Sequence, residues 1–202
     1  VVIGADSTGS ATDVLVRNTV GGEDGQQGPC FTVQSGGTFS GGRLHAELCQ
    51  DMGMVVETGS ADLEYVAIDH TRPSTTGTFG WGLELKPDST VTLRFGLLRK
   101  NTNLGIKVAG TDAQATLADL VVLDTLGEAY AAGLEGRDSA TIDLERAVFE
   151  RNQYSGILLE SAGTTLNATV RCIPLPAQPQ PGNSSPRDQP HHIRSSGIGK
   201  SA

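Results

Sequence analysis

A repeat of about 50 residues, made of two alternating segments, organises most of this chain and limits the folds open to it. Segments of the first kind end in a threonine, at Thr19, Thr71 and Thr125. Segments of the second kind end at Cys49, Asn101 and Asn152. In the second kind a glycine follows four residues after the end, at Gly53, Gly105 and Gly156. Each repeat unit is therefore a pair of similar coils.

Short β-strands are indicated inside each coil, because apolar residues alternate with polar ones. The pattern Gly-Ile106-Lys-Val108 shows this alternation, and Gly-Leu83-Glu-Leu85 repeats it. A second pair of apolar residues precedes each terminal threonine by five and three residues, as Val66 and Ile68 precede Thr71. Turn-forming Gly, Ser, Thr, Asp and Asn separate the strands. No segment has convincing helical spacing of apolar residues, so the sequence predicts an all-β protein.

A coil of this size cannot bury its apolar side chains alone, so it must stack on its neighbours as parallel sheets. The run Asn-x-x-x-Gly-Ile-x-Val that begins at Asn101, followed by a Gly/Thr turn, Ala-Thr-Leu and Asp-Thr, resembles the right-handed parallel β-helix proteins with pectin-lyase-like folds, in particular non-catalytic-looking bacterial members. The likeness extends from about Val1 to Cys172. We expect a right-handed parallel β-helix of about seven coils over residues 1–172, and a Pro/Ser/Gly-rich linker or disordered tail over residues 173–202.

Composition agrees with one such domain, since 37% of residues are hydrophobic and only 4% are aromatic. The net charge of −8 disfavours a nucleic-acid partner. No run of about 18 apolar residues predicts a membrane span. The chain begins inside a coil and without methionine, so we expect a fragment of a longer extracellular or cell-surface protein.

The three cysteines, Cys30, Cys49 and Cys172, lack the spacing of metal ligands. Cys30 and Cys49 fall in one coil and would pair in a secreted protein. A buried free thiol is an equally good interpretation of Cys49, which replaces the Asn of other coils.

Two rows of side chains are expected on the outer face of the Gly-apolar-x-apolar strands. The first row is Thr32, Val55, Glu84, Lys107, Glu135 and Leu158. The second row is Gln34, Glu57, Lys86, Ala109, Arg137 and Glu160. Opposite charges become neighbours in both rows, so a surface charge ladder is favoured over a catalytic groove.

An enzyme of this fold acting on acidic polysaccharide would need clustered carboxylates, which cations interrupt here. Signatures of the polygalacturonase type, such as Asn-Thr-Asp and Gly-His-Gly, are absent. We therefore assign no catalytic residue, cofactor or metal ligand, and keep a polysaccharide lyase or glycoside hydrolase as the alternative. Asn101 and Asn152 are expected to form a structural ladder, with their amides bonded to turn backbone and to each other.

Polar loops recur at one corner of alternate coils, and repeat proteins commonly place binding there. Aromatic residues stand near this corner and would either offer flat faces to sugar rings or plug the corner, the second being favoured. The candidate ligand-binding face is Trp81, Glu84, Lys107, Tyr130, Glu135 and Tyr154. The sequence thus predicts a non-enzymatic structural or interaction module whose partner is a polysaccharide or another surface protein.

Overall fold

The computed structural model describes residues 1–4, 6–21, 28–74, 77, 79–127 and 131–169, which contain fourteen β-strands and no helix. The odd-numbered strands are β1 (Val2–Ile3), β3 (Phe31–Gln34), β5 (Met52–Glu57), β7 (Trp81–Leu85), β9 (Leu104–Ala109), β11 (Ala132–Arg137) and β13 (Ser155–Leu159). The even-numbered strands are β2 (Thr8–Arg17), β4 (Thr38–Glu47), β6 (Ser60–Asp69), β8 (Thr90–Arg99), β10 (Gln114–Leu123), β12 (Thr141–Glu150) and β14 (Thr165–Thr169). The predicted tail, residues 173–202, and Cys172, the last residue of the predicted β-helix, lie outside the described residues.

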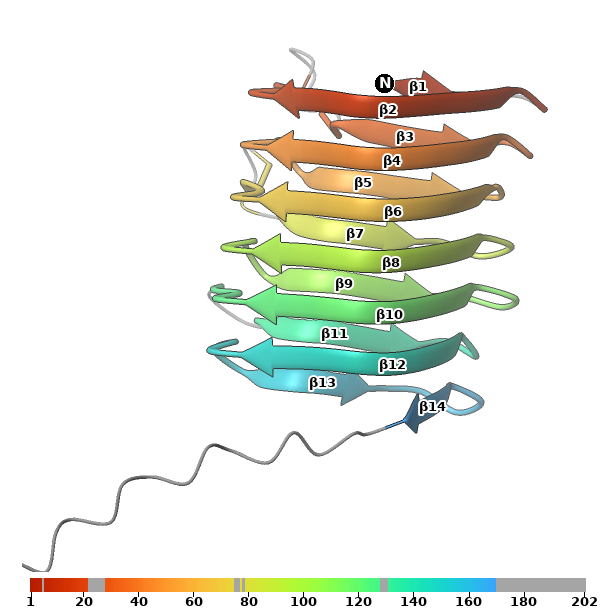
Figure 1. Ribbon diagram of the computed structural model, residues 1–202. Helices are drawn as coiled ribbons and strands as arrows, with labels where there is room; N and C mark the ends of the chain where they lie inside the picture. The colour runs from red at the N-terminus through yellow and green to blue at the C-terminus, as the bar shows by residue number, and fades with distance from the viewer. Residues whose placement is uncertain (5, 22–27, 75–76, 78, 128–130, 170–202) are drawn as a thin grey trace, which may run out of the picture. The chain divides into compact units, whose positions relative to one another are not determined.

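The fourteen described strands form two seven-stranded sheets, each parallel in its pairing. Odd-numbered strands form one sheet in the order β1-β3-β5-β7-β9-β11-β13, and even-numbered strands form the other in the corresponding order. The chain therefore crosses from one sheet to the other after every strand. In Figure 1 the rear strands run to the right, the front strands run to the left and the chain descends, which is a right-handed winding. The expected parallel β-helix is confirmed.

Apolar side chains of successive coils stack in columns between the two sheets. In the odd-numbered sheet Leu83 pairs with Ile106, Ile106 with Leu134, and Leu134 with Ile157. In the even-numbered sheet Val66 and Ile68, the apolar pair predicted before Thr71, point inward and are at most 4% exposed. The alternation read from the sequence therefore predicted the register correctly.

A column of glycines lines the inner face where the two sheets converge. Its members are Gly53, Gly82, Gly105, Gly133 and Gly156. A Cβ atom on Gly105 would lie 2.4 Å from Cγ1 of Val122 in the facing sheet and 2.5 Å from the carbonyl oxygen of Gly133. No side chain fits there without a shift of the backbone, so the repeat needs glycine for close packing.

Each of the six longest even-numbered strands bends at one residue with a positive φ angle. These residues are Asp13, Arg43, Tyr65, Phe95, Asp119 and Arg146. Their side chains form pairs between neighbouring coils along the outside of the bend. Asp13 accepts two hydrogen bonds from Arg43, and Asp119 accepts two from Arg146. Tyr65 and Phe95 stack with ring centroids 4.7 Å apart. The pairing has the two-coil period of the sequence.

Candidate functional site

The corner that leads from each even-numbered strand to the next odd-numbered strand carries long and short connections in alternation. The long connections are residues 18–30, 70–80 and 124–131, and the short ones are residues 48–51, 100–103 and 151–154. The opposite corner has only short connections. This confirms the prediction that insertions recur at one corner of alternate coils, beside the outer face of the odd-numbered sheet.

The residues read as coil ends in the sequence form one column at this corner, buried in its middle and partly exposed at its two ends: Thr19, Cys49, Thr71, Asn101, Thr125 and Asn152. Oδ1 of Asn101 accepts hydrogen bonds from the backbone N–H and the hydroxyl of Thr71, at 3.3 and 3.0 Å. Oδ1 of Asn152 accepts from the backbone N–H of Thr125 at 3.1 Å, and its Nδ2 donates to Val122.

The two asparagines thus bond backbone groups at the turn, as expected. They do not bond each other, because Thr125 stands between them in the column. Asn101 bonds the hydroxyl of Thr71 in the preceding coil, whereas Asn152 bonds the backbone N–H of Thr125, whose hydroxyl is buried without a hydrogen-bond partner among the described residues.

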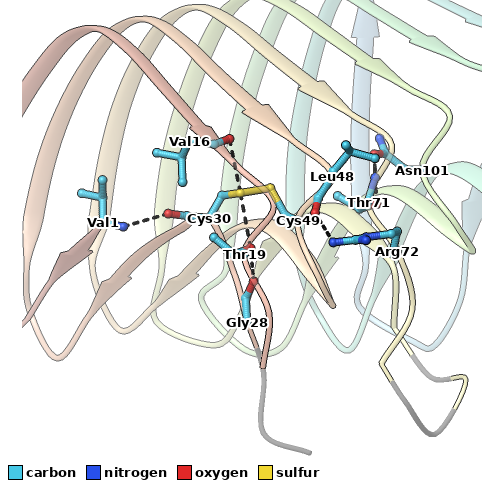
Figure 2. Close-up of a disulfide and its surroundings, with 10 residues drawn as sticks. All are labelled: Val1, Val16, Thr19, Gly28, Cys30, Leu48, Cys49, Thr71, Arg72 and Asn101. Atoms are coloured by element: carbon cyan, nitrogen blue, oxygen red, sulfur yellow. Dashed lines mark hydrogen bonds between the residues drawn. A yellow bond between two sulfur atoms is a disulfide. The ribbon is translucent and has the colours of Figure 1, made fainter. Parts of the chain in front are cut away.

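Cys30 and Cys49 form a disulfide at the N-terminal end of the same corner (Figure 2). Both cysteines are fully buried. Thr19 donates its hydroxyl to the carbonyl of Gly28 beside them at 2.5 Å, and Arg72 donates to the carbonyl of Leu48. The disulfide therefore ties the first long connection to the second coil, and of the two sequence interpretations the paired one describes this structure.

The predicted outer row is present in the odd-numbered sheet, where Glu84 pairs with Lys107 and Lys107 with Glu135. Nζ of Lys107 lies 3.0 Å from Oε1 of Glu84, and both side chains are under 10% exposed. The expected solvated charge ladder is therefore wrong for this row, which points outward yet is covered.

Two aromatic residues account for part of this cover. Nζ of Lys107 lies 3.8 Å from the centroid of the Trp81 ring, and Phe79 packs edge-on against Trp81 at 5.0 Å. The face of the Trp81 ring is thus occupied by the Lys107 ammonium group. Tyr154 is exposed in the last turn at this corner, and Tyr130 lies outside the described residues.

Burial raises the pKa of Glu135, and the cations Arg137 and Lys107 only partly offset this effect. Arg137 lies 3.5 Å from Oε1 of Glu135 and 3.2 Å from Asp138. Asp51, in the second coil, is also buried, and desolvation raises the pKa of its carboxyl although it accepts a hydrogen bond from the Gly28 N–H.

A hollow of about 680 Å³ opens on the outer face of the first coils, next to the first long connection. Its walls are Val2, Thr19, Val20, Gly28, Pro29, Thr32, Gln34, Val55, Glu57 and Lys86. The two charged groups neutralise each other, since Nζ of Lys86 lies 3.3 Å from Oε2 of Glu57. The remaining walls offer hydroxyl, amide and aliphatic groups. None of the described residues of the predicted binding face lines this hollow.

The sequence predicted that several residues lining this hollow face outward, but not that they surround a common space. Thr32, Gln34, Val55, Glu57 and Lys86 all belong to the two predicted outer rows. The sequence did not indicate that residues 19–20 and 28–29 form a wall of this hollow. The position of this wall depends on the disulfide and on hydrogen bonds such as that from the Gly21 N–H to Gln50.

Among the described residues, no group of three or more His, Cys, Asp or Glu side chains is arranged to hold a metal ion. Within the same residues, no helix is present that could cross a membrane. No family model matches this chain, and comparisons with curated proteins and with solved structures find no match either.

Proposed function

We propose that this chain is a non-enzymatic interaction module of a secreted or cell-surface protein, similar in architecture to the pectin-lyase-like β-helix proteins of bacteria. Its ligand is a neutral, hydroxyl-rich molecule such as a short glycan. The ligand lies in the hollow between residues 19–20 and 28–29 and the outer faces of β1, β3 and β5, beside Lys86, the residue that follows β7.

The hollow is the observation that carries this proposal. Its volume of about 680 Å³ falls in the range of about 300–1,000 Å³ usual for small-ligand sites. Thr32 and Gln34 supply hydrogen-bonding groups, while Val55 and Pro29 supply apolar surface for the faces of sugar rings. An acidic ligand would need an unpaired cation, but Lys86 is already paired with Glu57.

The disulfide supports the extracellular part of the proposal. Cys30 and Cys49 are both fully buried and bonded to each other. Disulfides persist in oxidising compartments and are rare in the cytosol.

Calorimetric titration with neutral oligosaccharides and with acidic oligogalacturonides or alginate fragments tests the ligand class. We expect measurable binding of a neutral sugar and none of the acidic ones. Gln34→Ala should weaken the affinity by about two- to tenfold, the effect of one hydrogen bond. Val55→Trp should fill the hollow and abolish binding.

Thr116→Ala, on the outer face of the even-numbered sheet, is the matched control and should bind as the wild type does. Equal binding by the Val55→Trp variant and the wild type would place the ligand elsewhere. Absence of binding across the neutral panel would remove the glycan from the proposal.

A glycoside hydrolase is the second candidate, and the raised pKa of Glu135 favours it, because a general acid needs a proton at neutral pH. Glu84 lies two strands from Glu135, about 10 Å by strand spacing, near the upper end of the separation in inverting enzymes. We prefer the non-enzymatic function because Lys107 engages Glu84 and stands between the two carboxyls.

Release of reducing ends from a polysaccharide panel distinguishes the two candidates. The enzyme hypothesis requires activity that falls by about a hundredfold or more in Glu135→Gln. We expect no release by either protein.

A further inference from the structure

The even-numbered sheet has a second outer face, beyond the bend, that presents apolar side chains to solvent. Its outward row is apolar except for His45 and consists of Leu15, His45, Ala67, Leu97, Val121 and Val148. Leu15 is 52% exposed and Val148 is 44% exposed. By contrast, the first outward row before the bend consists of Thr8, Thr38, Ser60, Thr90, Gln114, Thr141 and Thr165. The sheet thus has one polar outer face and one apolar outer face, which we call the apolar face.

The bend residues border the apolar face on one side. Their order along the solenoid is Asp13, Arg43, Tyr65, Phe95, Asp119 and Arg146. The stacked rings at the middle are themselves exposed, Tyr65 by 51% and Phe95 by 42%. The last residues of the strands border the other side, in the order Arg17, Glu47, Asp69, Arg99, Leu123 and Glu150.

We propose that the apolar face joins two copies of this chain in an antiparallel dimer, with a two-fold axis along the strand direction between β6 and β8. This symmetry brings the first coil of one copy onto the sixth coil of the other. Asp13 then faces Arg146 of the second copy, and Arg17 faces Glu150 of the second copy. At the centre, Tyr65 of each copy meets Phe95 of the other.

The charge order and the aromatic centre together favour this arrangement, because an isologous interface must be complementary to itself. When the order of the bend residues is reversed in the second copy, each acidic residue at the two ends faces a basic one, and the aromatic residues in the middle face each other. Glu64 meets Arg94 and Asp69 meets Arg99 by the same operation. A parallel dimer would also pair opposite charges, Asp13 with Arg17, Arg43 with Glu47 and Arg146 with Glu150. It would, however, press the exposed rings of Tyr65 and Phe95 onto Asp69 and Arg99, whose ion pair would lose water without gaining a partner.

The size of the apolar face predicts a moderate affinity. Six strands at a spacing of about 4.8 Å, and about five residues at about 3.3 Å each, give a footprint of about 29 by 16 Å per copy. The resulting total of about 900 Å² lies near the lower limit of specific interfaces. A reversible dimer with a dissociation constant in the micromolar range is therefore expected.

Sedimentation velocity of the full chain across the micromolar range tests the proposal. The sedimentation coefficient should rise with concentration from monomer to dimer. Leu97→Lys brings two like charges together near the axis and should raise the dissociation constant by about tenfold or more. Thr92→Lys, on the same strand but on the polar outer face, is the matched control and should dimerise as the wild type does. Far-UV circular dichroism melting of each variant separates loss of dimer from loss of fold.

A charge exchange tests the antiparallel arrangement. Arg17→Glu and Glu150→Arg should each weaken the dimer, and the double variant Arg17→Glu/Glu150→Arg should restore wild-type affinity. Within one chain the two residues lie five coils apart, about 24 Å, well beyond the Debye length of about 8 Å, so rescue can only act between chains. A monomeric wild type at all concentrations would overturn the dimer. Dimerisation that Leu97→Lys leaves intact would overturn the face, and failure of the double variant to recover would overturn the antiparallel arrangement.

Discussion

Replacing Gly105 by alanine should destabilise the protein far more than the same change at Gly42, a strand glycine outside the glycine column. The added Cβ would lie 2.4 Å from Cγ1 of Val122 and 2.5 Å from the carbonyl oxygen of Gly133. Both distances are too short for real contacts, and the carbonyl belongs to the backbone of the next coil, so adjoining coils or the facing sheet must shift. Overpacking of this kind costs about 1–3 kcal/mol. The lower entropy of the unfolded alanine variant offsets about 0.5–1 kcal/mol.

The structure provides graded controls for this substitution. At Gly42, on the outer side of β4, the nearest atom to an added Cβ is Oγ1 of Thr12 at 3.7 Å. Gly42→Ala should therefore be neutral or stabilising by about 0.5 kcal/mol. At Gly156, in the last coil, the nearest atom is Cβ of Phe149 at 3.2 Å. This variant should fall between the other two.

Urea denaturation followed by circular dichroism measures the free energy of unfolding of the three variants. The expected order of stability is Gly42→Ala, then Gly156→Ala, then Gly105→Ala, with about 2 kcal/mol between the extremes. Equal stability of Gly105→Ala and Gly42→Ala would refute the close approach of the two sheets along the glycine column.

Three further predictions concern the corner and the covered charges. Asn101→Leu removes the acceptor of the buried Thr71 N–H and should lower the unfolding free energy by about 1–3 kcal/mol. Asn167→Ala, on the surface, is the control and should change it by less than about 0.5 kcal/mol. Similar losses for the two variants in urea titrations would contradict the structural role of Asn101 at this corner. Reduction of the Cys30–Cys49 disulfide should lower stability by about 3 kcal/mol, whereas a Cys30→Ser/Cys49→Ser variant should not respond to dithiothreitol. Because the folded pKa of Glu135 is raised, the folded state holds this proton more tightly than the unfolded state, so the contribution of Glu135 to stability falls as pH rises from about 4.3 through the folded pKa. Glu135→Gln should remove that slope and be more stable than wild type at neutral pH; a pH profile of unfolding free energy with no difference between the two proteins would contradict the burial of this carboxylate.

The register of the coils was readable from the sequence because a strand has a side-chain period of two and each coil repeats it at the same offset. Pairs such as Leu83 and Leu85, recurring as Ile106 and Val108, could align in only one way with apolar residues inside. The threonine, asparagine and cysteine ends fell in one column for the same reason.

The bends in the even-numbered strands were not readable. A residue with positive φ is usually signalled by glycine or asparagine, but here Tyr65 and Phe95 occupy that conformation and so do arginines and aspartates. The remaining signal in the sequence was that successive coils carry either two aromatic residues or an acid and a base at this position.

The candidate site was predicted by position and not by environment. Alternation placed Glu84 and Lys107 outward as neighbours, which they are. Part of the cover over Lys107 is the ring of Trp81, against which Phe79 packs. Trp81 belongs to the adjoining coil, and the alternation of apolar and polar residues gives no sign of this contact, so it needed coordinates.

Distances between spin labels along one outer row test the central claim that each coil lies directly over the preceding one. Labelled cysteines at Thr8, Gln114, Thr38 and Thr165, introduced in pairs with Cys172→Ser, sample equivalent positions in the even-numbered sheet. Pulsed electron resonance should give backbone separations of about 19 Å for Thr8 with Gln114, about 24 Å for Thr38 with Thr165 and about 29 Å for Thr8 with Thr165, an increment of about 4.8 Å per coil. Separations that do not grow in proportion to the number of intervening coils would contradict the stacked solenoid.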